Sequence, residues 1–83
     1  MSFTLYILYS ASLDQYYVGQ TENIADRMFR HNNSGSRSTK KANDWKLVYT
    51  EEYETRALAC ARESEIKRKK SRSYIEMMIS SAG

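Results

Sequence analysis

The chain has 83 residues, with 13 Lys and Arg against 10 Asp and Glu, a formal net charge of +3 and one cysteine. A chain of this length makes one compact domain that buries roughly 60% of its unfolded surface, which excludes a multidomain enzyme. The lone Cys60 excludes an internal disulfide and a zinc site built from several cysteines, and it fits a reducing compartment.

The first ten residues, MSFTLYILYS, are largely apolar but have no preceding basic stretch and are too short for a signal core or a membrane span. We therefore expect a cytoplasmic protein that does not enter a membrane. Residues 3–8 alternate with the two-residue period of a strand that has two distinct faces. Tyr6 should thus point away from Phe3 and Leu5.

Residues 10–15 separate this strand from Tyr16-Tyr17-Val18, a spacing that favours an antiparallel hairpin whose second strand ends at Gly19. Thr21 followed by Glu22 is typical of a helix start, with a hydroxyl cap and a carboxylate in the first turn. Apolar residues at helical spacing follow, so we predict a helix from Glu22 to Asn32.

The segment from Asn32 to Asn43, NNSGSRSTKKAN, has the composition of a surface loop. A third strand is expected from Lys46 to Tyr53, a long helix from Glu54 to Lys69 and a shorter one from Arg72 to Ser80. The chain is thus predicted to be α+β, a single domain over residues 1–83. Its small three-stranded antiparallel sheet is flanked by helices in the order β-β-α-β-α-α.

Glu63 lies in one row with Ala59 and Ile66 on the predicted long helix. A carboxylate between two apolar positions is costly to bury unless a cation or hydrogen-bond donors lie beside it. A divalent metal could be that cation, because magnesium often takes only one or two protein carboxylates and completes its shell with water and phosphate oxygens. The alternative is an ordinary i, i+4 ion pair between Glu63 and Lys67.

Several of these residues occur in an order that resembles the GIY-YIG endonuclease family. Thr4-Leu5-Tyr6 stands for the first triplet of that motif, Tyr17-Val18-Gly19 stands eleven residues later for the second, and Arg27 and Glu63 follow. The resemblance covers most of the chain. It is to the small stand-alone members, which are similar to the N-terminal domain of the excision-repair nuclease.

The resemblance implies roles for five residues in phosphodiester hydrolysis. Tyr17 would be the general base for an attacking water, a role that requires its phenol to lose a proton. Arg27 would hold the scissile phosphate, since its planar fork matches two phosphate oxygens. Tyr6 would orient water or phosphate, and His31 would assist proton transfer or contact the phosphate. Glu63 would hold the catalytic Mg²⁺ or Mn²⁺.

The basic excess lies entirely in the C-terminal part, because residues 1–53 carry six basic and six acidic side chains and residues 54–83 carry seven and four. Clustered basic side chains can bind nucleic-acid phosphates without recognising a base sequence. The alternative is that basic residues at the end of a helix only stabilise it through the helix dipole. The candidate nucleic-acid contacts are Arg37, Lys40, Lys41, Lys67, Arg68, Lys70 and Arg72.

We therefore predict a metal-dependent endonuclease for DNA rather than RNA, acting on branched or damaged DNA of the kind met in DNA repair. One alternative is a nucleic-acid-binding module of the same fold that is non-catalytic or depends on a partner protein, and another is a structural interaction domain. Gln20 stands where excision-repair relatives have a lysine, and Ile75 and Glu76 stand where some relatives have an asparagine. These differences bear on whether the chain completes catalytic turnover. A monomer or a weak dimer is expected.

Overall fold

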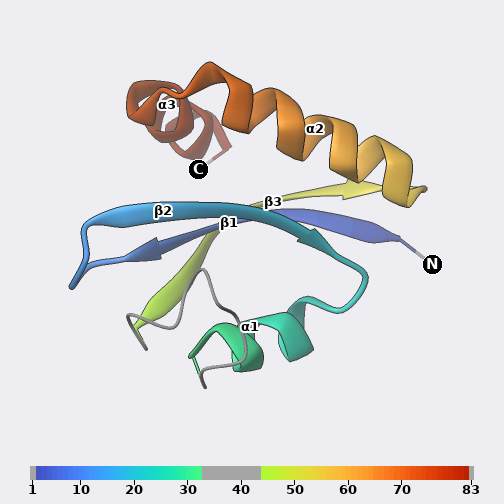
Figure 1. The fold of residues 1–83 in the computed structure, drawn as a ribbon, viewed down its shortest axis with the longest axis horizontal. Coiled ribbons are helices and arrows are strands. Elements are labelled where there is room, and N and C mark those ends of the chain that lie inside the picture. Colours follow the sequence, from blue (N-terminus) through green and yellow to red (C-terminus); the bar gives the residue numbers. More distant parts are fainter. Residues whose placement is uncertain (1, 33–43, 83) are drawn as a thin grey trace.

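The computed structural model of the chain describes residues 2–32 and 44–82. Its elements are β1 (Phe3–Ser10), β2 (Gln15–Thr21), α1 (Ile24–Asn32), β3 (Trp45–Tyr53), α2 (Arg56–Lys69) and α3 (Arg72–Ala82). The strands form an antiparallel sheet in the order β2-β1-β3, with α2 and α3 over one face and α1 over the other (Figure 1). The predicted α+β class and order of elements are confirmed.

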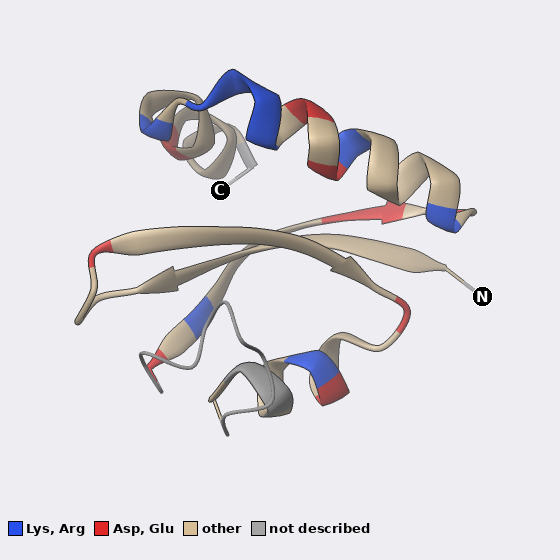
Figure 2. Ribbon diagram, viewed as in Figure 1, with Lys and Arg blue, Asp and Glu red and all other residues tan. Residues whose placement is uncertain are grey.

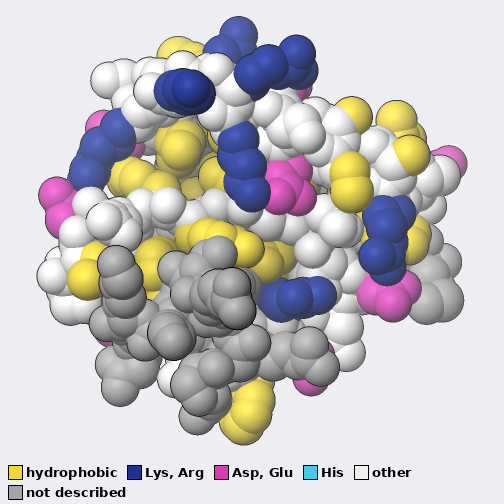
Figure 3. Space-filling model, in the orientation of Figure 1, with side chains coloured by type: hydrophobic (Ala, Val, Ile, Leu, Met, Phe, Trp, Pro, Cys, Tyr) yellow, Lys and Arg dark blue, Asp and Glu magenta, His cyan; other side chains and the backbone are white. Residues whose placement is uncertain are grey.

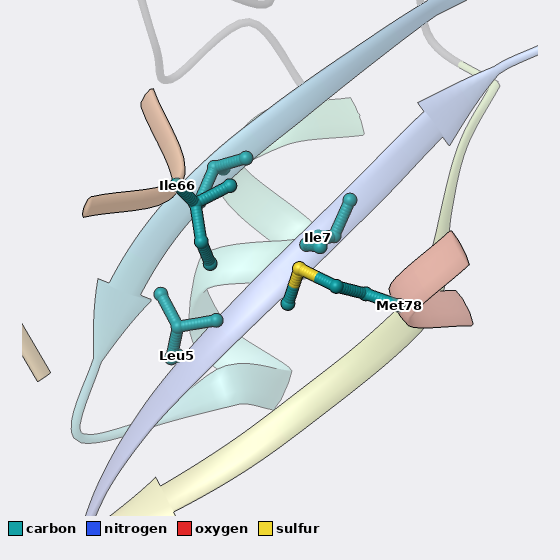
Figure 4. Close-up of a cluster of buried hydrophobic side chains, with 5 residues drawn as sticks. Leu5, Ile7, Ile66 and Met78 are labelled. Carbon is teal, nitrogen blue, oxygen red and sulfur yellow. The ribbon is translucent and has the colours of Figure 1, made fainter. Parts of the chain in front are cut away.

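Strand β1 lies in the centre of the sheet, so both of its faces are covered. On one face, Leu5 and Ile7 are fully buried and pack against Val18, Ile66 and Met78 from β2, α2 and α3 (Figure 4). This cluster fixes the two C-terminal helices on the sheet.

The other face of β1 carries a second cluster, made by Tyr6, Leu8 and Trp45. Ile24 and Met28 of α1 pack against it. The predicted alternation of β1 is thus confirmed, and Tyr6 lies on the face opposite Leu5.

Strand β2 continues two residues beyond Gly19, which corrects the expectation that this glycine ends it. The antiparallel register pairs Gly19 with Tyr6, and the pairing continues through Gln20 and Thr21. A glycine weakens a strand but does not stop it when neighbouring backbone groups still have partners in the ladder.

Helix α1 begins at Ile24, and the predicted start at Glu22 with a Thr21 cap was wrong. The capping atom is Oδ1 of Asn23, which accepts a hydrogen bond from the backbone N–H of Asp26 at 3.0 Å. Thr21 is still paired in β2, and its Oγ1 accepts from the N–H of Asn23 at 3.1 Å, forming the turn between strand and helix.

The later elements differ from their predicted bounds by one or two residues. Strand β3 begins at Trp45 instead of Lys46, because the Asn32 side chain donates to the Trp45 carbonyl at 3.1 Å and accepts from its N–H at 2.9 Å. Helix α2 begins after Thr55, whose Oγ1 accepts from the N–H of Leu58 at 3.2 Å. Helix α3 extends to Ala82.

Helix α2 is also fixed to β3 by a polar network around Glu51. Arg62 donates to this carboxylate through Nε at 3.0 Å and Nη2 at 3.3 Å, and the Tyr53 hydroxyl donates at 2.5 Å. The Tyr49 hydroxyl donates to the same group. Arg62 further contacts the Tyr74 hydroxyl of α3 at 3.3 Å, so one guanidinium joins three elements.

The predicted loop from Asn32 to Asn43 falls outside the described residues, apart from Asn32 at the end of α1. Over residues 2–32 and 44–82, no helix combines the length and the apolar character needed to cross a membrane.

Candidate functional site

The two motif tyrosines lie side by side near the edge strand β2. Tyr6 and Tyr17 come from paired strands, and their ring centroids are 6.4 Å apart. Trp45 and Tyr17 form an edge-to-face pair, again with 6.4 Å between centroids. Tyr6 is only 2% exposed, whereas Tyr17 is half-buried and reaches solvent.

Gly19 lets the Tyr6 ring cross its neighbouring strand. A Cβ atom at Gly19 would lie 2.6 Å from the Tyr6 hydroxyl oxygen, 2.7 Å from its Cζ and 3.2 Å from Cε1 of Tyr17. No other residue type fits without moving a buried ring. Glycine is therefore needed here for space, since its φ lies outside the left-handed region.

The Tyr6 phenol lies within electrostatic range of charges on both sides of the sheet. Burial raises its pKa well above the ordinary value, and Tyr17 raises it further. Arg27 on α1 opposes this shift in pKa, whereas the negative charge of Glu63 on α2 adds to it. Tyr6 thus keeps its proton at neutral pH and can act as a hydrogen-bond donor.

Glu63 occupies the position expected from the row on α2. Its neighbours Ala59 and Ile66 are 0% and 1% exposed, while its own side chain is 23% exposed. The Lys67 ammonium lies 2.6 Å from Oε2 of Glu63, so the predicted i, i+4 pair is present. The same ammonium is 5.7 Å from the centre of the Tyr17 ring, which places α2 and β2 side chains in one site.

Arg27 enters the site from the first turn of α1 and is half-buried. Its backbone N–H donates to the carbonyl of Asn23 at 3.1 Å, so the cap that starts α1 also positions this arginine. Tyr6, Tyr17, Arg27 and Glu63 come from β1, β2, α1 and α2, and the charges of Arg27 and Glu63 both act on the Tyr6 phenol. Charge from both helices can therefore act on one ligand.

A family model for the GIY-YIG catalytic domain matches residues 2–75. The chain belongs to the GIY-YIG family. A solved structure with a similar fold is the solution NMR structure of the UPF0213 protein BH0048 from Bacillus halodurans, with a TM-score of 0.60 and 27% sequence identity. The similarity covers 96% of this chain and 84% of that chain. No curated protein matches the chain. The GIY-YIG assignment establishes a nuclease-type fold.

Four of the sequence-predicted positions of this GIY-YIG domain lie wholly or partly outside the described residues. The backbone of His31 lies in α1, one turn after Arg27, but its side chain is not described. Arg37, Lys40 and Lys41 fall within residues 33–43, outside the described ranges.

The remaining basic candidates lie at the end of α2 and the start of α3 (Figure 2). Lys67 is paired with Glu63, as described above. Arg72 donates to Oδ1 of Asp14 at 2.6 Å and to Glu76 at 3.3 Å, so its charge is shared between two carboxylates. Arg68 and Lys70 are exposed.

The donor set of the site fits a hard cation that keeps most of its water, and it does not fit zinc. Within residues 2–32 and 44–82, no three His, Cys, Asp or Glu side chains gather as metal ligands. A magnesium ion needs only one or two carboxylates, and Glu63 can supply one. A metal ion at Glu63 would either share the carboxylate with the Lys67 ammonium or displace that ammonium.

Sequence reasoning missed two features of the site. It treated Lys67 as a helix partner and phosphate contact, and only the packing of α2 on β2 brings its ammonium near Tyr17. It also did not predict that Oε1 of Gln20 would be a buried acceptor without a hydrogen-bond partner in the described part of the chain. Such acceptors are rare in folded proteins, and a bound water or ligand donor would satisfy this one.

Proposed function

We propose that this GIY-YIG domain is a metal-dependent endonuclease that hydrolyses DNA phosphodiester bonds. The observation that carries the proposal is the pair of Tyr6 and Tyr17 rings with Arg27 and Glu63 within electrostatic range of Tyr6, in a chain matched by a catalytic-domain model. The elements that supply these side chains are rigid strands and helices, which favours a preorganised site.

The reaction needs a nucleophile, a base and stabilisation of charge on the phosphate. Tyr17 is half-buried at the open edge, where its phenolate would accept a proton from the attacking water. Arg27 would hold two oxygens of the scissile phosphate and stabilise the added negative charge as the water oxygen bonds to phosphorus. The 3′ oxygen then leaves as its bond to phosphorus breaks. The protonated Tyr6 would donate to the phosphate or the water.

Glu63 is the residue that would hold Mg²⁺ or Mn²⁺. A bound divalent ion supplies Lewis-acid stabilisation of the phosphate and of the departing oxygen. His31, one helical turn beyond Arg27, is proposed to assist proton transfer or the phosphate contact.

A second candidate function is supported by the ion pair between Lys67 and Glu63. With Lys67 Nζ at 2.6 Å, the carboxylate already has a cation, which would suit a GIY-YIG module that binds nucleic acid without cleaving it or acts only with a partner protein. Metal dependence distinguishes the two functions, because only the nuclease requires a metal ion at the Glu63 carboxylate, beside the Lys67 ammonium or in its place.

The test is cleavage of labelled single-stranded, duplex, flap and junction DNA with Mg²⁺, Mn²⁺ or EDTA. We expect metal-dependent cleavage by the wild type and loss of at least about 100-fold in Glu63→Gln. Glu65→Gln is the matched control, since Glu65 lies on the same helix but is paired with Arg62 at 2.6 Å. Equal loss in both variants, or cleavage in EDTA, would contradict the proposal. Salt-sensitive binding without cleavage would support the binding module.

A cytoplasmic location, a monomeric or weakly dimeric state and a role in DNA repair remain proposals. Cys60 is a free, half-buried thiol, which is compatible with a reducing compartment. Cell fractionation and measurement of the molar mass in solution would test the location and the oligomeric state.

A further inference from the structure

A pocket of about 420 Å³ lies beside the candidate site, between the β1–β2 turn and the junction of α2 with α3. This volume is within the usual range for small-molecule sites. Val18, Ile66 and Ile75 give it an apolar floor, and Lys67, Lys70 and Arg72 carry its positive charge. Figure 3 shows hydrophobic side chains recessed between Lys and Arg side chains on this part of the surface.

The pocket and the candidate site share two residues, Tyr17 and Lys67. Lys67 lies 2.6 Å from Glu63 and 5.7 Å from the centre of the Tyr17 ring, so its ammonium stands between the pocket and the candidate site. A ligand in the pocket would therefore lie beside Glu63, the residue proposed to hold the metal at the scissile phosphate.

One wall of the pocket presents planar groups. The guanidinium of Arg72 lies over the Tyr16 ring, with 5.2 Å from Cζ to the centroid, and Asp14 holds it there at 2.6 Å. Arginine planes and aromatic rings are the surfaces on which unstacked bases pack in single-strand binding proteins.

Lys70 stands at the rim in a conformation that favours glycine. It caps α2 with φ 48°, in the left-handed region, and its N–H donates to the carbonyl of Lys67 at 3.2 Å. Glycine would adopt this backbone without cost, so lysine at this position costs local stability. Within the described part of the chain, no carboxylate lies within ion-pair distance of the Lys70 ammonium, which can therefore meet a ligand anion.

We propose that this pocket binds the unpaired nucleobase of the nucleotide next to the scissile phosphate, with Lys70 at a backbone phosphate. A nucleotide joins the apolar faces of its base to an anionic phosphate, which matches an apolar floor with a cationic rim. The inference rests on the proposed action on DNA and deepens it: a base stacked inside a duplex cannot enter, so the pocket selects DNA with an unpaired nucleotide at the cut.

The test measures binding in EDTA, where no cleavage can occur, by fluorescence anisotropy on two labelled duplexes. One carries a single unpaired adenosine, and the other carries an abasic residue at the same position. Base stacking should make the wild type bind the first duplex about tenfold more tightly. In Ile75→Trp, which fills the pocket, the ratio of the two affinities should fall to near one. Ile79→Trp, one turn further along α3 and outside the pocket, should keep it.

Lys70→Gly is a second variant, and glycine suits the left-handed backbone at this position. It should melt at the same or a higher temperature than the wild type because it removes the left-handed lysine. It should nevertheless bind both duplexes several-fold more weakly, and more weakly than Arg56→Ala, which removes an exposed charge at the other end of α2, outside the pocket.

A ratio near one in the wild type, or an unchanged ratio in Ile75→Trp, would overturn the inference. Equal affinities of Lys70→Gly and Arg56→Ala would overturn the phosphate contact at Lys70. These outcomes are independent of the nuclease proposal: metal-dependent cleavage with a ratio near one leaves that function standing without this pocket. A tenfold ratio in a chain that never cleaves supports the pocket and removes the nuclease function.

Discussion

Gly19 shows how one small residue positions the whole site. Its missing side chain is the space into which the buried Tyr6 ring extends, so that the hydroxyl approaches the edge of the sheet. This gives a steric reason for glycine in the Tyr17-Val18-Gly19 triplet.

We expect Gly19→Ala to destabilise the fold by about 1–3 kcal/mol, because a Cβ 2.6 Å from a buried hydroxyl forces the ring to move. Urea unfolding measures this change. The double variant with Tyr6→Phe should recover part of the loss, since the nearest atom is then absent. An unchanged midpoint in Gly19→Ala would show that Tyr6 is not held as described.

Tyr6 also gives the domain a pH dependence at the alkaline side. The unfolded phenol ionises near pH ~10, whereas burial raises the pKa of Tyr6 in the folded state, so the unfolded chain releases this proton first. The stability from this group is complete below pH ~10 and falls as the pH rises further. Between about pH 9 and pH 11, Tyr6→Phe should lose less stability than the wild type. Parallel losses in urea unfolding would contradict this.

Lys67 competes for the carboxylate that the proposed metal needs. Because the pair is half exposed, the ion pair contributes little, and Lys67→Met should tighten Mn²⁺ binding by no more than roughly fivefold. Isothermal titration measures this affinity, with Lys69→Met as the control on the same helix. Weaker binding in Lys67→Met would mean that the ammonium does not compete at Glu63.

At the scale of elements, the Glu51 and Arg62 pair ties β3 to α2 and α3. Burial alone would raise the pKa of Glu51, but hydrogen bonds from Arg62, Tyr49 and Tyr53 outweigh it and hold the pKa below its usual range. Arg62→Met should cost about 2–3 kcal/mol, because it leaves a partly buried carboxylate without its main partner. Arg56→Met, whose pair with Glu22 at 4.0 Å is exposed, should change stability by less than about 1 kcal/mol. Similar unfolding free energies for the two variants would contradict this account.

The elements that depend on local pattern were predictable, and those that depend on distant contacts were not. The alternation in β1 and the row on α2 follow from side-chain periodicity, so the placement of Tyr6 and Glu63 could be inferred. The start of α1 could not, because Thr21 is held in β2 by pairing with Thr4 rather than by its neighbours. The approach of Lys67 to Tyr17 likewise depends on how α2 packs on β2.

At the scale of the whole molecule, the site lies at an open sheet edge with helices on both faces (Figure 1). The basic end of α2 adjoins this edge, which leaves room for a long polyanion to lie across both (Figure 2). Affinity for DNA should therefore fall steeply with salt, with a linear dependence of log K on log salt concentration.

Arg68→Ala should reduce the steepness of that dependence by about 1, since one fewer phosphate is neutralised. Binding measured over a series of salt concentrations gives the slope for the wild type and the variant. A Glu65→Gln variant, which changes charge on the same helix by removing an anion, should not reduce it. A slope that is equal in wild type and Arg68→Ala would place the DNA away from this end of α2.

The measurement that tests the central claim most directly is the single-turnover cleavage rate of Tyr17→Phe against that of Tyr16→Phe. The two tyrosines are neighbours on β2, but Tyr17 lies in the proposed reaction centre, while Tyr16 packs beside the core and under Arg72. Removing the hydroxyl of a general base should slow cleavage by about 100-fold or more in Tyr17→Phe. Tyr16→Phe should stay within a few-fold of wild type. Equal rates in the two variants would contradict a hydrolytic site built on Tyr17.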